Sequence, residues 1–308
     1  MKKIILFNFL IVTILFLLLE FSLRIFNIIT LQGFEKDLFY TEKNVVYHYP
    51  NVIKTIMGKK TKTDKNGFRI PLEKFNYKDN LKSFLVLGDS VSFGVGIDEK
   101  DTFVGILRKK INYNLYNSSV AGYRLENYSY LLEKYHNQFS QINEVLIFLC
   151  INDIVSKAGV VREERLNINS KNDNFFNRIR NKNFIIKINF FLREKSTVFN
   201  LVKALGTQNV KRHFDYINPY YNNNIILSQY EDSLKKIINY SKLNKINVRF
   251  VLLPYKHQIN KKCKNEYMTP QIQINKIFQK YNYTLFDFSR DFCNKDINKK
   301  LFLNFDPM

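Results

Sequence analysis

The sequence predicts an α/β domain with a parallel sheet, preceded by one transmembrane helix. Three observations predict it: an apolar amino-terminal segment, short apolar runs that alternate with helical segments from residue 81 onward, and turn residues between them. Alternation of this kind is typical of βαβ units, whose right-handed crossovers make the strands parallel. The chain has 308 residues, of which 45% are apolar and 24% charged, so it can form a sizeable core.

The basic charge does not indicate a nucleic-acid partner. The net charge of +21 comes from lysines and arginines spread along the chain, and neither zinc-finger spacing nor an RNP-type aromatic signature accompanies them. A basic surface close to anionic lipid explains the charge more simply. The chain has only four histidines, and no Cys/His cluster has metal-ligand spacing, so no metal is expected either.

The three cysteines do not make a disulfide framework. Cys150 ends an apolar run and is expected to be a buried thiol. Cys263 and Cys293 lie in polar surroundings, where they pair if that part of the chain is outside the cytoplasm or remain two free thiols.

The amino terminus, residues 1–29, is predicted to be a transmembrane signal-anchor. After two lysines, residues 4–29 are almost wholly apolar and long enough for a bilayer core of about 30 Å. Glu20 and Arg24 stand one turn apart and can pair near the interface. No small-x-small cleavage site follows, so the segment is expected to stay attached. The two lysines orient the amino terminus inward and the body outward.

Residues 30–80 are expected to form a connector or amino-terminal extension. Within it, the Asn66-Gly67 pair predicts a hairpin or tight turn, because both residues tolerate positive φ. This segment therefore has some structure of its own.

Five apolar strands alternate with helices from residue 81 onward. The expected strands are residues 83–87, 113–116, 145–149, 248–253 and 284–288, and the expected helices are residues 102–111, 124–138, 226–243 and 269–281. Asp101 is expected to cap the first of these helices, and Thr269 with Pro270 to open the last. Ligands of such sheets bind at the carboxyl ends of the strands.

Residues 155–225 interrupt the alternation. Two helices with apolar faces are expected between Phe175 and Leu205. The simplest interpretation is a helical insertion packed on the domain, and the alternatives are a lid over the site or a surface that rests on the membrane.

Three polar segments follow the first three strands, so they are expected to meet at the carboxyl edge of the sheet. They contain Ser90, Gly122 and Asn152, respectively. A serine hydroxyl is a nucleophile for acyl transfer, and the N–H groups of Ser90 and Gly122 can form an oxyanion hole with the amide of Asn152. The neighbouring Asp89 and Asp153 are interpreted as turn-forming residues rather than catalytic ones.

Gly88-Asp89-Ser90, Gly122 and Asn152 resemble the first three blocks of the SGNH (GDSL-type) hydrolase superfamily. Asn66-Gly67-Phe68-Arg69 is similar to a segment that follows the membrane helix in bacterial envelope members. The resemblance covers residues 81–308. It implies a three-layer α/β/α, flavodoxin-like domain whose five-stranded parallel sheet has the order 2-1-3-4-5, without metal or organic cofactor. Cys150 stands where the family usually has glycine and is small enough to fit.

The last block of the family, Asp-x-x-His, is represented here only by its aspartate. In such enzymes the histidine takes the proton from the serine, and the aspartate orients the ring. Asp306 occupies the aspartate position, and the sequence stops at Met308, one residue before the expected histidine. Three interpretations stay open: the sequence is truncated, His257 after the fourth strand substitutes for the missing base, or the protein is an inactive relative.

The resemblance implies a serine esterase or O-acyltransferase that acts on acyl esters, often of cell-envelope polysaccharide. The expected site residues are Ser90, Gly122, Asn152 and Asp306, and the expected partner is an acylated carbohydrate or another ester. The expected location is the inner membrane, crossed once, with the body facing the periplasm or the cell exterior. The alternative is a catalytically inactive, membrane-tethered protein that binds glycan or protein.

Overall fold

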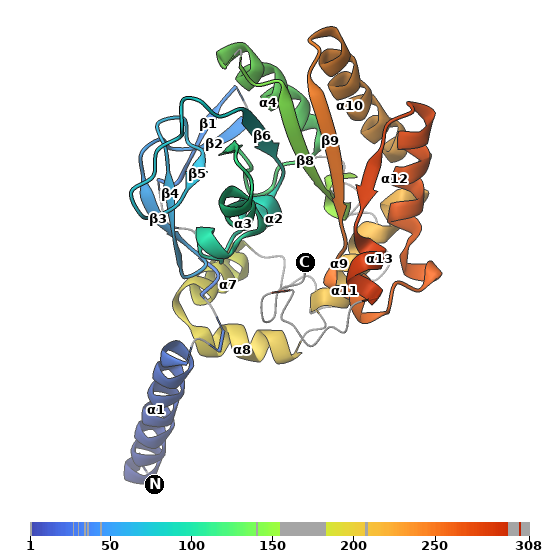
Figure 1. The fold of residues 1–308 in the computed structure, drawn as a ribbon. Coiled ribbons are helices and arrows are strands. Elements are labelled where there is room, and N and C mark those ends of the chain that lie inside the picture. Colours follow the sequence, from blue (N-terminus) through green and yellow to red (C-terminus); the bar gives the residue numbers. More distant parts are fainter. Residues whose placement is uncertain are drawn as a thin grey trace.

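The computed structural model has the expected alternation of strands and helices (Figure 1). It describes residues 2–26, 28–29, 31–33, 35, 37–43, 45–139, 141–154, 183–206, 209–294 and 302. The strands are β1 (Phe39–Glu42), β2 (Val45–His48), β3 (Ile53–Ile56), β4 (Lys59–Thr63), β5 (Arg69–Ile70), β6 (Ser83–Leu87), β7 (Asn114–Asn117), β8 (Glu144–Cys150), β9 (Asn247–Leu253) and β10 (Leu285–Asp287). The α-helices are α1 (Lys2–Ile25), α2 (Ser90–Phe93), α3 (Phe103–Lys110), α4 (Leu125–Gln138), α7 (Asn183–Lys195), α8 (Thr197–Gly206), α9 (Asn209–Ile217), α10 (Asn224–Leu243), α11 (Lys256–Asn260), α12 (Thr269–Lys280) and α13 (Ser289–Asn294). Short 3-10 turns are η1 (Glu99–Asp101), η2 (Ile151–Ile154), η3 (Asn218–Asn222) and η4 (Asn265–Tyr267).

One mixed sheet forms the centre of the body. Its order is β10-β9-β8-β6-β7-β5-β4-β3. The five strands expected from the sequence are β6 to β10, and each is parallel to its neighbours among them. Numbered along the chain, these five have the expected order 2-1-3-4-5.

The expected five-stranded sheet is wrong in strand number, because the described sheet has eight strands. The three others come from the amino-terminal extension: β5 pairs antiparallel with β7, and β4 and β3 follow. Sequence patterns missed β4 because its five residues are only lysine and threonine, with no apolar run. The predicted Asn66-Gly67 turn is confirmed between β4 and β5, with Gly67 at φ 80°.

Helices cover both faces of the parallel part of the sheet. Leu85 and Leu87 of β6 lie in one buried cluster with apolar residues of α4, α10 and α12. Phe84 and Val86 lie in another with Val104 of α3. Successive residues of a strand point to opposite faces, so β6 is buried on both sides.

Two helix starts differ by a residue or so from the expectation. Thr102, not Asp101, caps α3, because its hydroxyl accepts the N–H of Gly105 at 3.0 Å while Asp101 ends the preceding 3-10 turn. In α12, Met268 is the N-cap and Thr269 the first helical residue, with Pro270 in the first turn as expected.

Helix α1 leaves the body as a separate rod (Figure 1). Residues Lys3–Ile25 are long and apolar enough to cross a membrane, and no part of their most apolar window is buried in the protein. The expected ion pair between Glu20 and Arg24 is present at 2.7 Å. By length and composition, α1 agrees with the predicted anchor.

The segment that interrupts the alternation is described only in part. Residues 155–182 lie outside the described residues, and so does the start of the stretch that begins at Phe175. The two helices expected in that stretch correspond to α7 and α8. They lie next to α1 in Figure 1, on the side of the body that faces the anchor.

Candidate active site

The loops after β6, β7 and β8 are joined by hydrogen bonds. The N–H of Val120 donates to the carbonyl oxygen of Gly88 at 3.2 Å, which joins the second loop to the first. The side-chain Nδ2 of Asn152 donates to Oδ2 of Asp89 at 3.2 Å, which joins the third loop to the first. Both bonds end within two residues of Ser90. The three sequence segments therefore lie together at the carboxyl edge of the sheet.

Ser90 begins the four-residue helix α2, and its side chain is half-buried. Asp89 caps this helix, because its carboxylate accepts the N–H of Val91 at 2.9 Å. The helix ends at Gly94 in the left-handed region, at φ 82°, which glycine adopts without strain. Within the described residues, neither the hydroxyl nor the N–H of Ser90 makes a hydrogen bond, so both can contact a substrate.

Gly88 allows the turn to close tightly before Ser90. A Cβ at residue 88 would lie 2.2 Å from Oγ of Ser92 and 3.2 Å from the carbonyl oxygen of Phe148. Ser92 itself is fully buried, so a substrate cannot reach its hydroxyl. The half-exposed Ser90 is therefore the accessible serine of this turn.

Gly122 lies on an exposed part of the second loop. Its φ is 87°, and a Cβ there would meet nothing within 4 Å. In the described structure its N–H makes no hydrogen bond, so it is available to an acceptor. Asn117 supports this loop by donating to the carbonyl oxygen of Ser92 and accepting the N–H of Ser119, each at 3.2 Å.

Asn152 is held by Asp89 and keeps one side-chain N–H for another acceptor. An amide has two N–H groups, and the bond to Asp89 uses one of them. The thiol of Cys150 also approaches Asp89, with Sγ 3.5 Å from Oδ1. Cys150 is buried, as expected, and fits at the position where the resemblance has glycine. The carboxylate of Asp89 thus contacts both Cys150 and Asn152.

Two buried carboxyl groups lie beneath the site. Burial raises the pKa of Asp89, and it raises that of Asp153 well above its ordinary range. Repulsion from Asp89 adds to the shift at Asp153. Asp153 accepts the N–H of Cys150 at 2.9 Å and the hydroxyl of Tyr128 at 3.1 Å. These contacts agree with the structural role expected for both aspartates.

His257, the candidate in one of the three open interpretations of the missing base, is buried. Its ring packs between those of Phe214 and Tyr267, with centroids 5.0 and 5.1 Å away. Burial lowers its pKa. No hydrogen bond joins Ser90 to any of the four histidines, all of which lie in the described part of the chain.

His213 contacts Tyr255, a contact that the sequence analysis did not predict. Its ring stacks on Tyr255 at 5.4 Å, and its Nε2 lies 3.3 Å from the hydroxyl of Tyr255. Tyr255 follows β9 at the same sheet edge; burial raises its pKa, and the charges of Cys150 and Asp89 add to the rise. His213 belongs to the interrupting segment, which carries no strand pattern that could have placed it at this edge.

Arg69 is a further residue that sequence reasoning did not assign. Its buried guanidinium donates to the carbonyl oxygen of Gly94 at 2.6 Å and also to those of Phe93 and Ile97. It lies over the ring of Phe93, 4.9 Å from the centroid. Arg69 therefore fixes the end of the helix that Ser90 begins. The sequence signal for Arg69 is its place in the Asn66-Gly67-Phe68-Arg69 segment.

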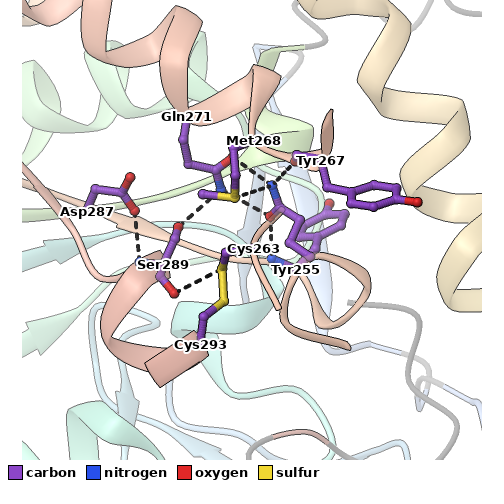
Figure 2. The surroundings of a disulfide bond; sticks show 9 residues. Tyr255, Cys263, Tyr267, Met268, Gln271, Asp287, Ser289 and Cys293 are labelled. Atoms are coloured by element: carbon purple, nitrogen blue, oxygen red, sulfur yellow. Dashed lines mark hydrogen bonds between the residues drawn. A yellow bond between two sulfur atoms is a disulfide. The ribbon is translucent and has the colours of Figure 1, made fainter. Parts of the chain in front are cut away.

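Asp306 lies outside the described residues, so its place in the site stays a prediction. The preceding part of the chain is fixed by a disulfide between Cys263 and Cys293, whose Cα atoms are 6.0 Å apart. Figure 2 shows this bond beside Ser289, whose carbonyl oxygen is 3.4 Å from Sγ of Cys263. Ser289 also accepts a hydrogen bond from Gln271 at 3.2 Å. Of the two alternatives for these cysteines, the structure has the paired one.

Comparisons with known proteins give only distant likenesses. No family model and no curated protein matches the chain. Among solved structures, TesA has 14% identity and a TM-score of 0.35 over 66% of this chain and 76% of its own. The esterase EstA from Pseudoalteromonas sp., inhibited by monoethylphosphonate, has 14% identity and a TM-score of 0.36 over 67% of this chain and 77% of its own. A mutant of esterase AlinE4 has 12% identity and a TM-score of 0.37 over 74% of this chain and 87% of its own. Likenesses at this level carry no functional inference.

Proposed function

We propose that this chain is a membrane-anchored serine esterase or O-acyltransferase of the SGNH type, with Ser90 as its nucleophile. One observation carries the proposal. A half-exposed serine with an unengaged N–H lies on a loop that hydrogen bonds join directly to the loops of Gly122 and Asn152. Hydrogen-bond donors near a nucleophile favour acyl transfer, because they stabilise the oxyanion that forms.

The reaction follows from these groups. Oγ of Ser90 attacks the ester carbonyl carbon, and the carbonyl oxygen becomes an oxyanion. The N–H groups of Ser90 and Gly122 and Nδ2 of Asn152 donate to that oxygen, and each such donor is typically worth about a hundredfold or more in rate. The alcohol leaves with a proton, and water or a sugar hydroxyl then takes the acyl group from the serine.

The proton of the Ser90 hydroxyl needs a base. By resemblance, we propose as base a histidine three positions after Asp306, with Asp306 orienting its ring. A chain without a base is expected to turn over slower by a factor on the order of a million. His257 is a weaker candidate because its ring is buried between two aromatic rings.

The proposed substrate is an acyl ester of cell-envelope polysaccharide, and the proposed location is the inner membrane with the body outside the cytoplasm. The disulfide between Cys263 and Cys293 supports the location, because such bonds persist in oxidising compartments. The apolar helix α1 supports membrane attachment.

A fluorophosphonate probe and a p-nitrophenyl acetate assay test the proposal. Both are applied to the 308-residue chain and to the chain with a histidine added after Met308. We expect the extended chain to be labelled and active, and Ser90→Ala to abolish both signals. Ser129→Ala, a partly exposed serine of α4, is the matched control.

The rival function is an inactive, tethered protein that binds glycan or protein. It requires that no form of the chain, extended or not, reacts with the fluorophosphonate. Activity that survives Ser90→Ala would contradict the assignment of the nucleophile.

A further inference from the structure

Helices α7 and α8 expose apolar side chains that no described part of the protein covers. On α7 these are Phe184, Ile188 and Phe191, which lie on one helix face and are 70%, 38% and 60% exposed. On α8 they are Val202 and Leu205, which are 63% and 73% exposed. We call these five residues the apolar patch. Exposed apolar side chains gathered on two helices that contact each other mark a candidate binding surface.

The start of α8 is attached to the membrane helix. The carboxylate of Glu20 accepts the N–H groups of Thr197 and Val198 at 2.8 and 2.9 Å, as an N-cap residue would. It also accepts the hydroxyl of Ser196 at 2.9 Å. Arg24 donates to the carbonyl oxygen of Lys195, the last residue of α7, at 2.7 Å. The junction of α7 and α8 therefore sits beside the last turns of α1.

These contacts set the depth of the junction. Glu20 lies five residues before the end of α1 at Ile25, which is about 7.5 Å along a helix axis. The apolar run that precedes Glu20, residues 4–19, is about 24 Å long, close to the thickness of a bilayer core. If α1 crosses the membrane, Glu20 and the start of α8 lie at the boundary between acyl chains and headgroups.

The direction of α8 fits that boundary. Figure 1 shows α8 crossing the direction of α1 rather than continuing it. A helix that lies in the plane of a membrane buries its apolar face about 5 to 10 Å deep at this boundary. Lys187 and Lys195 on α7 are exposed next to the patch, where they can meet anionic headgroups.

We propose that α7 and α8 are a second membrane contact, with the apolar patch inserted among the lipids of the bilayer that α1 spans. The occupant of the patch is phospholipid, because both helices that carry it start or end at the junction that Glu20 and Arg24 hold beside α1. The interrupting segment then rests on the membrane, which was one of the three interpretations of its sequence. This inference does not depend on the chemistry at Ser90.

Quenching of a single attached fluorophore by nitroxide-labelled lipid tests whether the apolar patch is inserted in the membrane. The full chain is reconstituted into phosphatidylcholine and phosphatidylglycerol vesicles. A polarity-sensitive fluorophore is attached to Phe191→Cys, Leu205→Cys or Leu243→Cys. Leu243, on α10, is 82% exposed and serves as the matched control. The native cysteines do not compete, because Cys150 is buried and the other two are bonded.

We expect labels at residues 191 and 205 to emit at shorter wavelength and to lose emission when the vesicles contain lipid with a nitroxide near the headgroup. The label at 243 should show neither change. Emission at 205 that matches the control overturns the proposal, because α8 is then in water. Blue-shifted emission without nitroxide quenching also overturns it, since a protein surface, such as a second copy, then covers the patch. If the label at residue 205 is quenched and the label at residue 191 is not, the proposal is overturned for α7.

A charge-reversed variant gives an independent measurement. Lys187→Glu with Lys195→Glu leaves the patch intact and removes the attraction to anionic headgroups. Quenching at residue 205 should then decrease more in vesicles with phosphatidylglycerol than in those of phosphatidylcholine alone. An equal response in both lipids contradicts the role given to the two lysines.

Discussion

The guanidinium of Arg69 donates to the carbonyl oxygen of Gly94 at 2.6 Å, which ties the amino-terminal strands to the turn that carries Ser90. Arg69 lies in β5, which pairs antiparallel with β7 and β4. The first 80 residues thus contribute directly to the geometry of the candidate site. A fragment that begins at residue 81 would lack this support.

Replacing Arg69 should impair turnover more than substrate binding. Arg69→Met removes the guanidinium donor from three carbonyl oxygens, two of them buried, and each hydrogen bond to a charged group is worth about 1.5 to 3 kcal/mol. In the histidine-extended chain, we expect kcat to fall at least tenfold with little change in KM, because loss of Arg69 displaces the turn that carries the nucleophile. Arg69→Lys should recover part of kcat. Arg290→Met, on an exposed arginine, is the control. Equal losses in the Met and Lys variants, in stability and kcat alike, would indicate a purely structural role.

Two glycines of the site should respond differently to alanine. In Gly88→Ala the new Cβ would meet Ser92 and Phe148, so we expect loss of the folded site and of labelling at Ser90. In Gly122→Ala the Cβ enters open space, and only the positive φ is strained, at a cost of about 1 kcal/mol. Urea unfolding and fluorophosphonate labelling measure both effects. A Gly88→Ala chain as stable as Gly122→Ala would contradict this close packing.

The buried carboxyl of Asp153 should make stability depend on pH. Its pKa is raised in the folded state above the ordinary 3.8, so the folded protein holds the proton more tightly than the unfolded chain. Stability from this group is fully present below pH 3.8 and is lost as the pH rises through the folded-state pKa, by about 1.4 kcal/mol for each pH unit between the two values. Asp153→Asn removes this titration, so its stability relative to the native chain should increase from pH 4 towards pH 7. Urea unfolding across this range, at about five pH values, measures the difference. A constant difference would show that the carboxyl does not titrate as described.

The disulfide should protect two of the three cysteines in the protein taken from cells. Closing the loop between Cys263 and Cys293, which are 30 residues apart, stabilises the fold by about 3 to 4 kcal/mol in the chain-entropy description. After denaturation without reductant, a maleimide should modify Cys150 alone, and reductant should expose the other two. Modification of all three without reductant would place the body in a reducing compartment.

The sequence predicted the parallel sheet well, because β6 and β8 contain continuous apolar runs and β9 is apolar after Arg249. It could not predict β4, whose lysines and threonines form a strand only by pairing with β3 and β5. The sequence also predicted where the loops of Ser90 and Asn152 lie, because each loop directly follows a recognisable apolar strand. The link from Asp89 to Asn152 is a contact across 63 residues, which no local pattern encodes.

The attachment of α8 to Glu20 fixes the start of α8 relative to α1. A body on a flexible linker explores a volume that grows with linker length, so it can act on targets at many distances from its anchor. Here the last turns of the anchor and the start of α8 share one set of hydrogen bonds. If α1 spans a membrane as proposed, these bonds hold the start of α8 at one height over the bilayer, and a substrate of Ser90 must come to the body rather than be reached by a mobile tether.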